Sequence, residues 1–175
     1  MAGLLSLLVC HTAGAQCTSI LSDGDFEEQP LSGKLRSPWY SEGGAGIDPK
    51  RGLSYRSDNN AWVGKKVGWN AIFHFPTPLS KGVLYTLTAF VRTSDDARDG
   101  YFGFRNKDQS VVKELQKFGP IHTYRELKLR FRPERTDSYR VFIGFWSRSP
   151  ESWIRVDYVS LDSPCNDTIT NPGEQ

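Results

Sequence analysis

Acidic side chains gather near the start of the chain, at Asp23, Asp25, Glu27 and Glu28. Two carboxylates about 5–10 Å apart can serve as the acid and base of a glycosidase, but such pairs normally face each other across a cleft from different strands. In this sequence, Glu151 and Asp157 are the obvious distant partners. The same oxygens could instead hold a calcium ion or belong to a solvated turn. The cluster alone does not choose between these three possibilities.

Other catalytic patterns are missing from the sequence. It has no G-x-S-x-G, no H-E-x-x-H and no glycine-rich phosphate loop. With only three histidines, of which His74 and His122 lie in the body of the chain, most metal-dependent hydrolases are excluded. We therefore expect that the protein is not an enzyme.

Aromatic side chains offer a different chemistry. The chain carries 5 Trp, 7 Tyr and 10 Phe, and several of these rings alternate with apolar residues rather than sharing their phase. Phe90, Phe142 and Trp146 are of this kind, so they are predicted to face away from the core of their strands. A flat ring beside Asn, His or Arg suits a sugar, because the ring stacks on the C–H face of a pyranose while polar groups bind its hydroxyls.

The predicted ligand-binding side chains are Trp69, Asn70, His74, Phe90, Arg92, Tyr101, Phe142 and Trp146. Trp69 is the predicted main stacking platform. It shares its phase with Ala71 and Phe73, whereas Asn70 and His74 have the opposite phase. Either Trp69 therefore sits in a bulge at the start of its strand, or Asn70 and His74 face elsewhere. For any single ring, packing in the core is the alternative.

The elements that position these residues are strands. Apolar residues recur with a period of two in residues 69–75, 83–92, 126–132, 140–146 and 153–158. Turn residues punctuate the chain at short intervals, as at Ser80-Lys81-Gly82 and Asp99-Gly100. Only residues 111–118 show weak helical spacing. The pattern predicts an all-β, antiparallel β-sandwich of about eight to eleven strands in a single domain.

The charge pattern narrows the choice of partner. The formal net charge is +2, which argues against a nucleic acid partner. No apolar run reaches the ~18–20 residues of a membrane span. Lys128, Arg130 and Arg132 share one phase of a strand, and a solvated outer face explains them best. If this basic stripe bordered a binding cleft, an anionic polysaccharide would become plausible.

The two ends of the chain resemble processing segments. Residues 1–15 are apolar and end in the small-residue site Ala13-Gly14-Ala15, which predicts a cleaved signal peptide and a secreted protein. A buried N-terminal strand or helix is the alternative. Residues 16–165 then form the domain, and residues 166–175 form a flexible polar tail. Asn166 opens an N-glycosylation sequon.

Cysteine usage agrees with export. Cys10 lies in the predicted signal peptide, which leaves Cys17 and Cys165 at opposite ends of the mature domain. An even pair of cysteines in an exported chain predicts a disulfide, provided that both ends of the domain lie side by side.

Four segments carry a resemblance to a known family. In order, residues 20–27, 68–74, 84–92 and 153–161 resemble the family 4/9/22 carbohydrate-binding modules (CenC-type, galactose-binding-like) of secreted glycanases, over about residues 18–163. The resemblance implies a β jelly roll that binds β-glucans, xylan or related chains in a cleft on one concave sheet, without cleaving them. The sequence departs from the family at Ala71 and His74, where a Trp-x-Gly-x-x-Gln pattern is common.

The resemblance also implies a structural calcium ion. Its ligands would be Asp25, through its carbonyl, together with Glu27 and Asp157. We therefore expect a secreted, monomeric and non-catalytic module that binds a β-linked polysaccharide or oligosaccharide. The alternative is an extracellular structural or adhesion protein that uses the same sandwich to contact protein or cell wall.

Overall fold

The computed structural model describes residues 19–31, 34–49, 53–108 and 110–164. The predicted signal peptide, both cysteines of the predicted disulfide, Asn166 and the predicted tail lie outside these residues. The described part of the chain contains eleven strands and no helix. It accordingly holds no helix long and apolar enough to span a membrane.

The strands form two antiparallel sheets. The six-stranded sheet has the order β1 (Trp39–Glu42), β4 (Gly68–His74), β10 (Asp137–Ser147), β7 (Gly100–Asn106) and β8 (Val112–Phe118), with β5 (Thr77–Leu79) also paired to β10. The five-stranded sheet has the order β2 (Ala45–Asp48), β3 (Asn60–Gly64), β11 (Trp153–Asp162), β6 (Tyr85–Thr93) and β9 (Arg125–Phe131).

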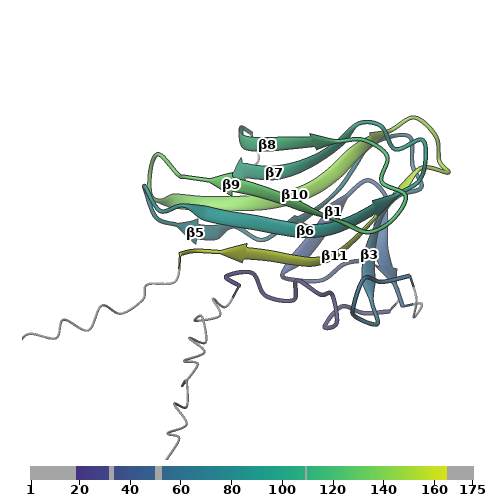
Figure 1. The fold of residues 1–175 in the computed structure, drawn as a ribbon, viewed down its shortest axis with the longest axis horizontal. Helices are drawn as coiled ribbons and strands as arrows, with labels where there is room; N and C mark the ends of the chain where they lie inside the picture. Colours follow the sequence, from purple (N-terminus) through teal and green to yellow (C-terminus); the bar gives the residue numbers. More distant parts are fainter. Residues whose placement is uncertain (1–18, 32–33, 50–52, 109, 165–175) are drawn as a thin grey trace, which may run out of the picture.

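The chain crosses repeatedly between the two sheets, and the long strands β6, β10 and β11 run along the length of the molecule (Figure 1). This arrangement confirms the predicted all-β antiparallel sandwich. It also provides each sheet with one face toward the core and one face outward, so that the outward faces are available for a ligand.

The core lies between the sheets and follows the predicted alternation. In β6, Tyr85, Leu87, Ala89 and Val91 are all buried, and in β10 Ile143 and Phe145 are fully buried. Because successive residues of a strand point to opposite faces, the residues between them project outward. The two-residue period of the sequence thus determines which side chains can reach a ligand.

Residues 111–118 correct one expectation. The weak helical spacing there is not a helix but strand β8, which pairs with β7 at the edge of the six-stranded sheet. Most of its side chains are exposed or half-buried. An edge strand carrying Lys113 and Lys117 can be polar on both sides, so its sequence lacks the clean alternation of a central strand.

Candidate functional site

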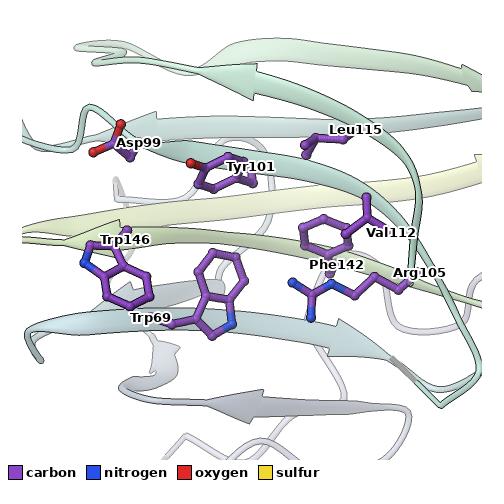
Figure 2. A pocket seen from close by; sticks show the side chains of 8 residues that line it. All are labelled: Trp69, Asp99, Tyr101, Arg105, Val112, Leu115, Phe142 and Trp146. Atoms are coloured by element: carbon purple, nitrogen blue, oxygen red, sulfur yellow. The ribbon is translucent and has the colours of Figure 1, made fainter. Parts of the chain in front are cut away.

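A groove of about 450 Å³ lies on the outer face of the six-stranded sheet (Figure 2). Its lining residues are Trp69, Asp99, Tyr101, Arg105, Val112, Leu115, Phe142 and Trp146. Four of the predicted binding residues, Trp69, Tyr101, Phe142 and Trp146, therefore come together here. They belong to strands β4, β7 and β10, which are neighbours in the sheet.

The strand register explains why these rings meet. Trp69 of β4 pairs directly with Trp146 of β10, and Tyr101 of β7 pairs with Gly144 of β10. Directly opposed residues of an antiparallel pair share a face of the sheet, as do residues two apart on one strand. The three rings therefore project from the same side.

Small residues keep the middle of this face low. Gly144 pairs with Ala71, and Gly103 pairs with Phe142. A Cβ atom on Gly144 would come within 2.5 Å of the Cβ of Ala71. The strands are thus packed too closely at this point for a larger side chain, and the surrounding rings rise above it as walls of the groove.

The three rings differ in how freely a ligand can reach them. Trp146 is 55% exposed, whereas Trp69 and Tyr101 are half-buried. The Trp69 ring lies 6.0 Å from that of Tyr101, and its Nε1 donates a hydrogen bond of 3.1 Å to Oε2 of Glu42. Trp146 is thus the most open stacking surface, and Trp69 is held in place by its neighbours.

Phe142 lies under the groove rather than on its surface. Only 1% of it is exposed, and its ring packs at 6.2 Å from Phe73 and at 6.5 Å from Trp69. The guanidinium carbon of Arg105 lies 4.7 Å from the centre of the Phe142 ring. Phe142 therefore supports the groove but presents no free ring face for stacking, which corrects its predicted role.

Asn70 and His74 do not line the groove, because they alternate with Trp69 and Phe73 along β4. The Asn70 side chain is fully buried, accepts a hydrogen bond from the Gly44 backbone N–H at 2.7 Å and donates to the carbonyls of Lys66 and Gly68. It therefore orders the turn into β4. No bulge is needed to place Trp69.

His74 is buried beside Trp39, whose ring meets it edge-on at 5.1 Å. Its Nδ1 lies 3.0 Å from the carbonyl oxygen of Phe75. Burial lowers the pKa of His74, against the smaller opposing effects of backbone hydrogen bonds and the Asp23 charge. This histidine therefore belongs to the packed interior and not to the binding face.

Phe90 and Arg92 lie on the five-stranded sheet, on the other side of the sandwich. The Tyr55 ring stacks on Phe90 with the ring centres 3.9 Å apart, and the Arg92 guanidinium carbon lies 5.9 Å from the Trp153 ring. Both residues do point away from the core, as predicted. However, they face outward from the five-stranded sheet, whereas Trp69 faces outward from the six-stranded sheet. The phase of a residue along its strand does not show to which sheet the strand belongs, so this part of the prediction was wrong.

The predicted calcium ligands lie near the five-stranded sheet. Asp157 is fully buried, and its carboxylate accepts hydrogen bonds from the Tyr55, Arg56 and Tyr158 N–H groups and from the Ser57 hydroxyl. Burial raises the pKa of the Asp157 carboxyl, and these hydrogen bonds oppose that shift. The carboxylate thus organises the loop that covers Phe90.

Glu27 binds the end of the same loop, since its Oε1 accepts the Asn59 N–H at 2.8 Å. Asp25 instead caps its own turn, with Oδ1 3.4 Å from the Glu27 N–H. Among the described residues, no group of three or more His, Cys, Asp or Glu side chains could hold a metal ion. A calcium ion here would depend on backbone carbonyls for most of its six to eight oxygens.

The basic stripe does not border the groove. Lys128 and Arg130 alternate with the buried Leu127 of β9 and are exposed on the outer face of the five-stranded sheet. This agrees with the solvated outer face that the sequence favoured.

The sequence reading missed Asp99, Arg105, Val112 and Leu115 as groove residues. The signal for Arg105 was present, because Tyr101, Gly103 and Arg105 alternate with the fully buried Phe102 and Phe104 of β7. Val112 and Leu115 had no such signal, since edge strand β8 lacks a clear alternation.

No protein-family model matches the sequence, and neither does any curated protein. Solved structures do match its fold. The module TmCBM61, solved in complex with β-1,4-galactotriose, superposes with a TM-score of 0.61 at 12% identity, covering 83% of this chain and 99% of the other. The CBM22-1 xylan-binding domain of Paenibacillus barcinonensis Xyn10C gives 0.54 at 12% identity, over 84% and 95% of the two chains.

Enzymes also match. The Stig cyclase Fisc from Fischerella sp. TAU gives a TM-score of 0.63 at 13% identity, over 85% of this chain and 98% of the other. Two longer enzyme chains match over only 27% and 21% of their own lengths. Modules of families 4 and 16 match as well. At these identities the likeness concerns the fold, and it confirms that the chain has the β jelly roll of carbohydrate-binding modules.

Proposed function

We propose that the protein is a non-catalytic glycan-binding module that binds a β-linked polysaccharide or oligosaccharide in the groove of the six-stranded sheet. The observation that carries this proposal is the convergence of Trp69, Tyr101 and Trp146 on one open groove. Sugar rings present a flat C–H face, and partly exposed aromatic rings at fixed positions on a rigid sheet are suited to it.

Polar groups beside the rings can form hydrogen bonds with the hydroxyls of a sugar. Asp99 lines the groove, and its Oδ2 lies 3.0 Å from Nη2 of Arg148, which holds the carboxylate at the rim. Glu42 is held near Trp69 by the indole N–H. Apolar walls with a few fixed polar groups are the usual composition of a small-ligand site.

The groove favours binding over cleavage. Asp99 is the one acidic residue among the described residues that line it, whereas glycoside hydrolysis ordinarily needs two carboxylates on either side of the bond. The fold likeness to modules solved with a galactotriose or described as xylan-binding supports a glycan as the class of ligand. Fold alone does not assign function, as the cyclase match illustrates.

Secretion, the disulfide and the calcium ion belong to the same proposal. The backbone N–H of Ile20 donates to the carbonyl of Leu161 at 2.8 Å, so the first and last described segments lie side by side, close in sequence to Cys17 and Cys165. Glu27 and Asp157 both bind the loop of residues 55–59. Thermal melting with and without a chelator tests the calcium ion. If the ion is bound, the chelator should lower the melting temperature of the protein by several degrees.

Binding to insoluble polysaccharides, followed by a glycan array, tests the function. We expect retention on at least one β-linked polysaccharide, and loss of that retention in Trp146→Ala. Tyr158→Ala is the matched control, because Tyr158 is a 40% exposed ring on β11, in the five-stranded sheet. Failure of the wild-type protein to bind any glycan would contradict the proposal and favour the adhesion alternative.

A further inference from the structure

Arg105 occupies an unusual position at one end of the groove. It projects from β7 on the same face as Tyr101, and its guanidinium carbon lies 4.7 Å from the ring centre of Phe142, 5.5 Å from that of Trp69 and 5.7 Å from that of Phe73. Figure 2 shows the guanidinium beside Phe142, with Trp69 between it and Trp146 at the other end of the groove. The guanidinium of Arg105 thus makes cation–π contacts with three aromatic rings.

Arg105 lacks an anionic partner within the part of the chain that the structure describes. It forms no ion pair or side-chain hydrogen bond with any described residue, and its buried Nε has no hydrogen-bond partner among them. The rings beneath it contribute a cation–π attraction but remove water from one side of the guanidinium. A charge that is partly dehydrated and unpaired gains strongly from an anion that reaches it.

The neighbouring charges do not supply that anion. Asp99, the acidic residue of the groove lining, is bound to Arg148. Lys117 adds a further cation, since its Nζ lies 5.9 Å from the centre of the Tyr101 ring. Glu42, beside Trp69, accepts the indole N–H at 3.1 Å and forms no ion pair with Arg105 in the described part of the chain. Arg105 and Lys117 are thus two cations along this side of the groove that an acidic ligand could meet.

We infer that the groove takes an acidic glycan, in which a uronate carboxylate pairs with Arg105 while a sugar ring stacks on Trp69 and Trp146. The planar fork of arginine matches the two oxygens of a carboxylate in a bidentate pair, which a single hydroxyl cannot reproduce. This inference rests on the proposed glycan-binding function and specifies its substrate class. It assigns the anionic preference to Arg105 and not to the basic stripe on β9.

Two ligands of the same backbone test the inference, namely cellohexaose and a β-1,4-glucuronan hexasaccharide, which differ in the group at C6. Calorimetric titration of each at 0.05 M and 0.5 M salt should show at least tenfold tighter binding of the glucuronan at low salt. That advantage should shrink severalfold at high salt, because the screening length falls from above ~10 Å to a few ångströms. Cellohexaose binding should change little with salt.

Variants of Arg105 test whether this residue is the source of the preference for the glucuronan. Arg105→Met keeps an unbranched chain over the rings and removes the charge, so the ratio of glucuronan affinity to cellohexaose affinity should fall to about one. Arg105→Lys should retain part of the salt dependence but lose much of the preference, because an ammonium lacks the fork. Arg130→Met is the matched control, an exposed arginine on the opposite sheet, and should bind like the wild type.

The outcomes separate this inference from the proposed function. Equal or tighter binding of cellohexaose by the wild type, or an unchanged preference in Arg105→Met, would overturn the acidic-glycan assignment and leave glycan binding standing. If neither this pair nor a matched pair of galacturonan and galactan oligosaccharides binds, and the array is also blank, then the proposed function fails and the inference fails with it. Thermal melting of each variant shows that the protein compared is folded.

Discussion

Trp69 and Trp146 are paired directly across strands β4 and β10, yet they stand in different environments on the same face. Trp146 is 55% exposed, whereas Trp69 is half-buried between Tyr101 and Phe142 and hydrogen bonded to Glu42. The open ring can be removed at little cost to the fold, while the enclosed ring contributes to the wall of the groove. This difference separates their expected roles in stability and binding.

Trp146→Ala should weaken glycan binding by about 1.5–3 kcal/mol, which is the contribution of a large ring that a ligand covers. Its free energy of unfolding should change by no more than about 0.5 kcal/mol, because the side chain is mostly in solvent. Trp69→Ala should reduce both quantities. Titration with the bound glycan and urea denaturation measure the two effects. A destabilised Trp146→Ala with normal affinity would contradict this assignment.

Gly144→Ala should destabilise the protein by about 1–3 kcal/mol, since the new methyl group would lie 2.5 Å from the Cβ of Ala71 and 2.7 Å from the carbonyl oxygen of Asn70. Gly119→Ala is the control, because a Cβ there meets nothing within 4 Å and the backbone angle is not in the left-handed region. Equal melting temperatures for the two variants would show that β4 and β10 are not so closely packed.

The free energy of unfolding should fall as the solution is acidified below about pH 6.5. Burial lowers the pKa of His74 in the folded protein, so the unfolded chain binds the proton more tightly. Neutral, buried His74 therefore makes its full contribution to the free energy of unfolding above the ordinary histidine pKa. That contribution is lost as the pH falls toward the pKa of His74 in the folded protein.

Urea denaturation between pH 7.5 and 5 measures this dependence. His74→Leu should have a flatter profile than the wild type, whereas His122→Gln, at an exposed position beside Asp95, should keep the wild-type profile. Identical slopes for wild type and His74→Leu would rule out His74 as the source.

Asp157→Asn should cost about 2–3 kcal/mol of stability, because an amide nitrogen cannot accept the hydrogen bonds that now reach both carboxylate oxygens. Glycan affinity per folded molecule should be unchanged, since Asp157 lies on β11 of the five-stranded sheet, away from the groove. Asp95→Asn, at an exposed position, is the control and should be nearly neutral. A loss of affinity in folded Asp157→Asn would place the ligand on the other sheet.

Cys17 and Cys165 should be joined in the mature protein. In the chain-entropy model, a bridge that closes most of the domain contributes about 4–5 kcal/mol if it is unstrained. Non-reducing mass mapping of the secreted protein should recover one peptide pair that contains both cysteines. Two free thiols would disprove the pairing.

The sequence alone determined the fold class and the two faces of the strands that alternate clearly. Its period of two identified Leu87, Ala89 and Val91 as core residues and placed Phe142 and Trp146 on the outward phase of their strand. These inferences are reliable because a strand has only two faces and one of them must be buried. The opposite phase of Trp69 relative to Asn70 and His74 was likewise a property of the sequence, and of these three residues only Trp69 lines the groove.

Tertiary structure alone decided which sheet each outward face belongs to. Phe90 and Trp146 have the same phase signal, but β6 and β10 lie in different sheets and their outward faces point to opposite sides of the molecule. The groove also depends on contacts between distant segments, such as Arg105 of β7 over Phe142 of β10 and Trp69 of β4. Local periodicity fixes the direction of a side chain relative to its own strand, whereas its neighbours follow from strand order and register, which are set by packing across the whole sandwich.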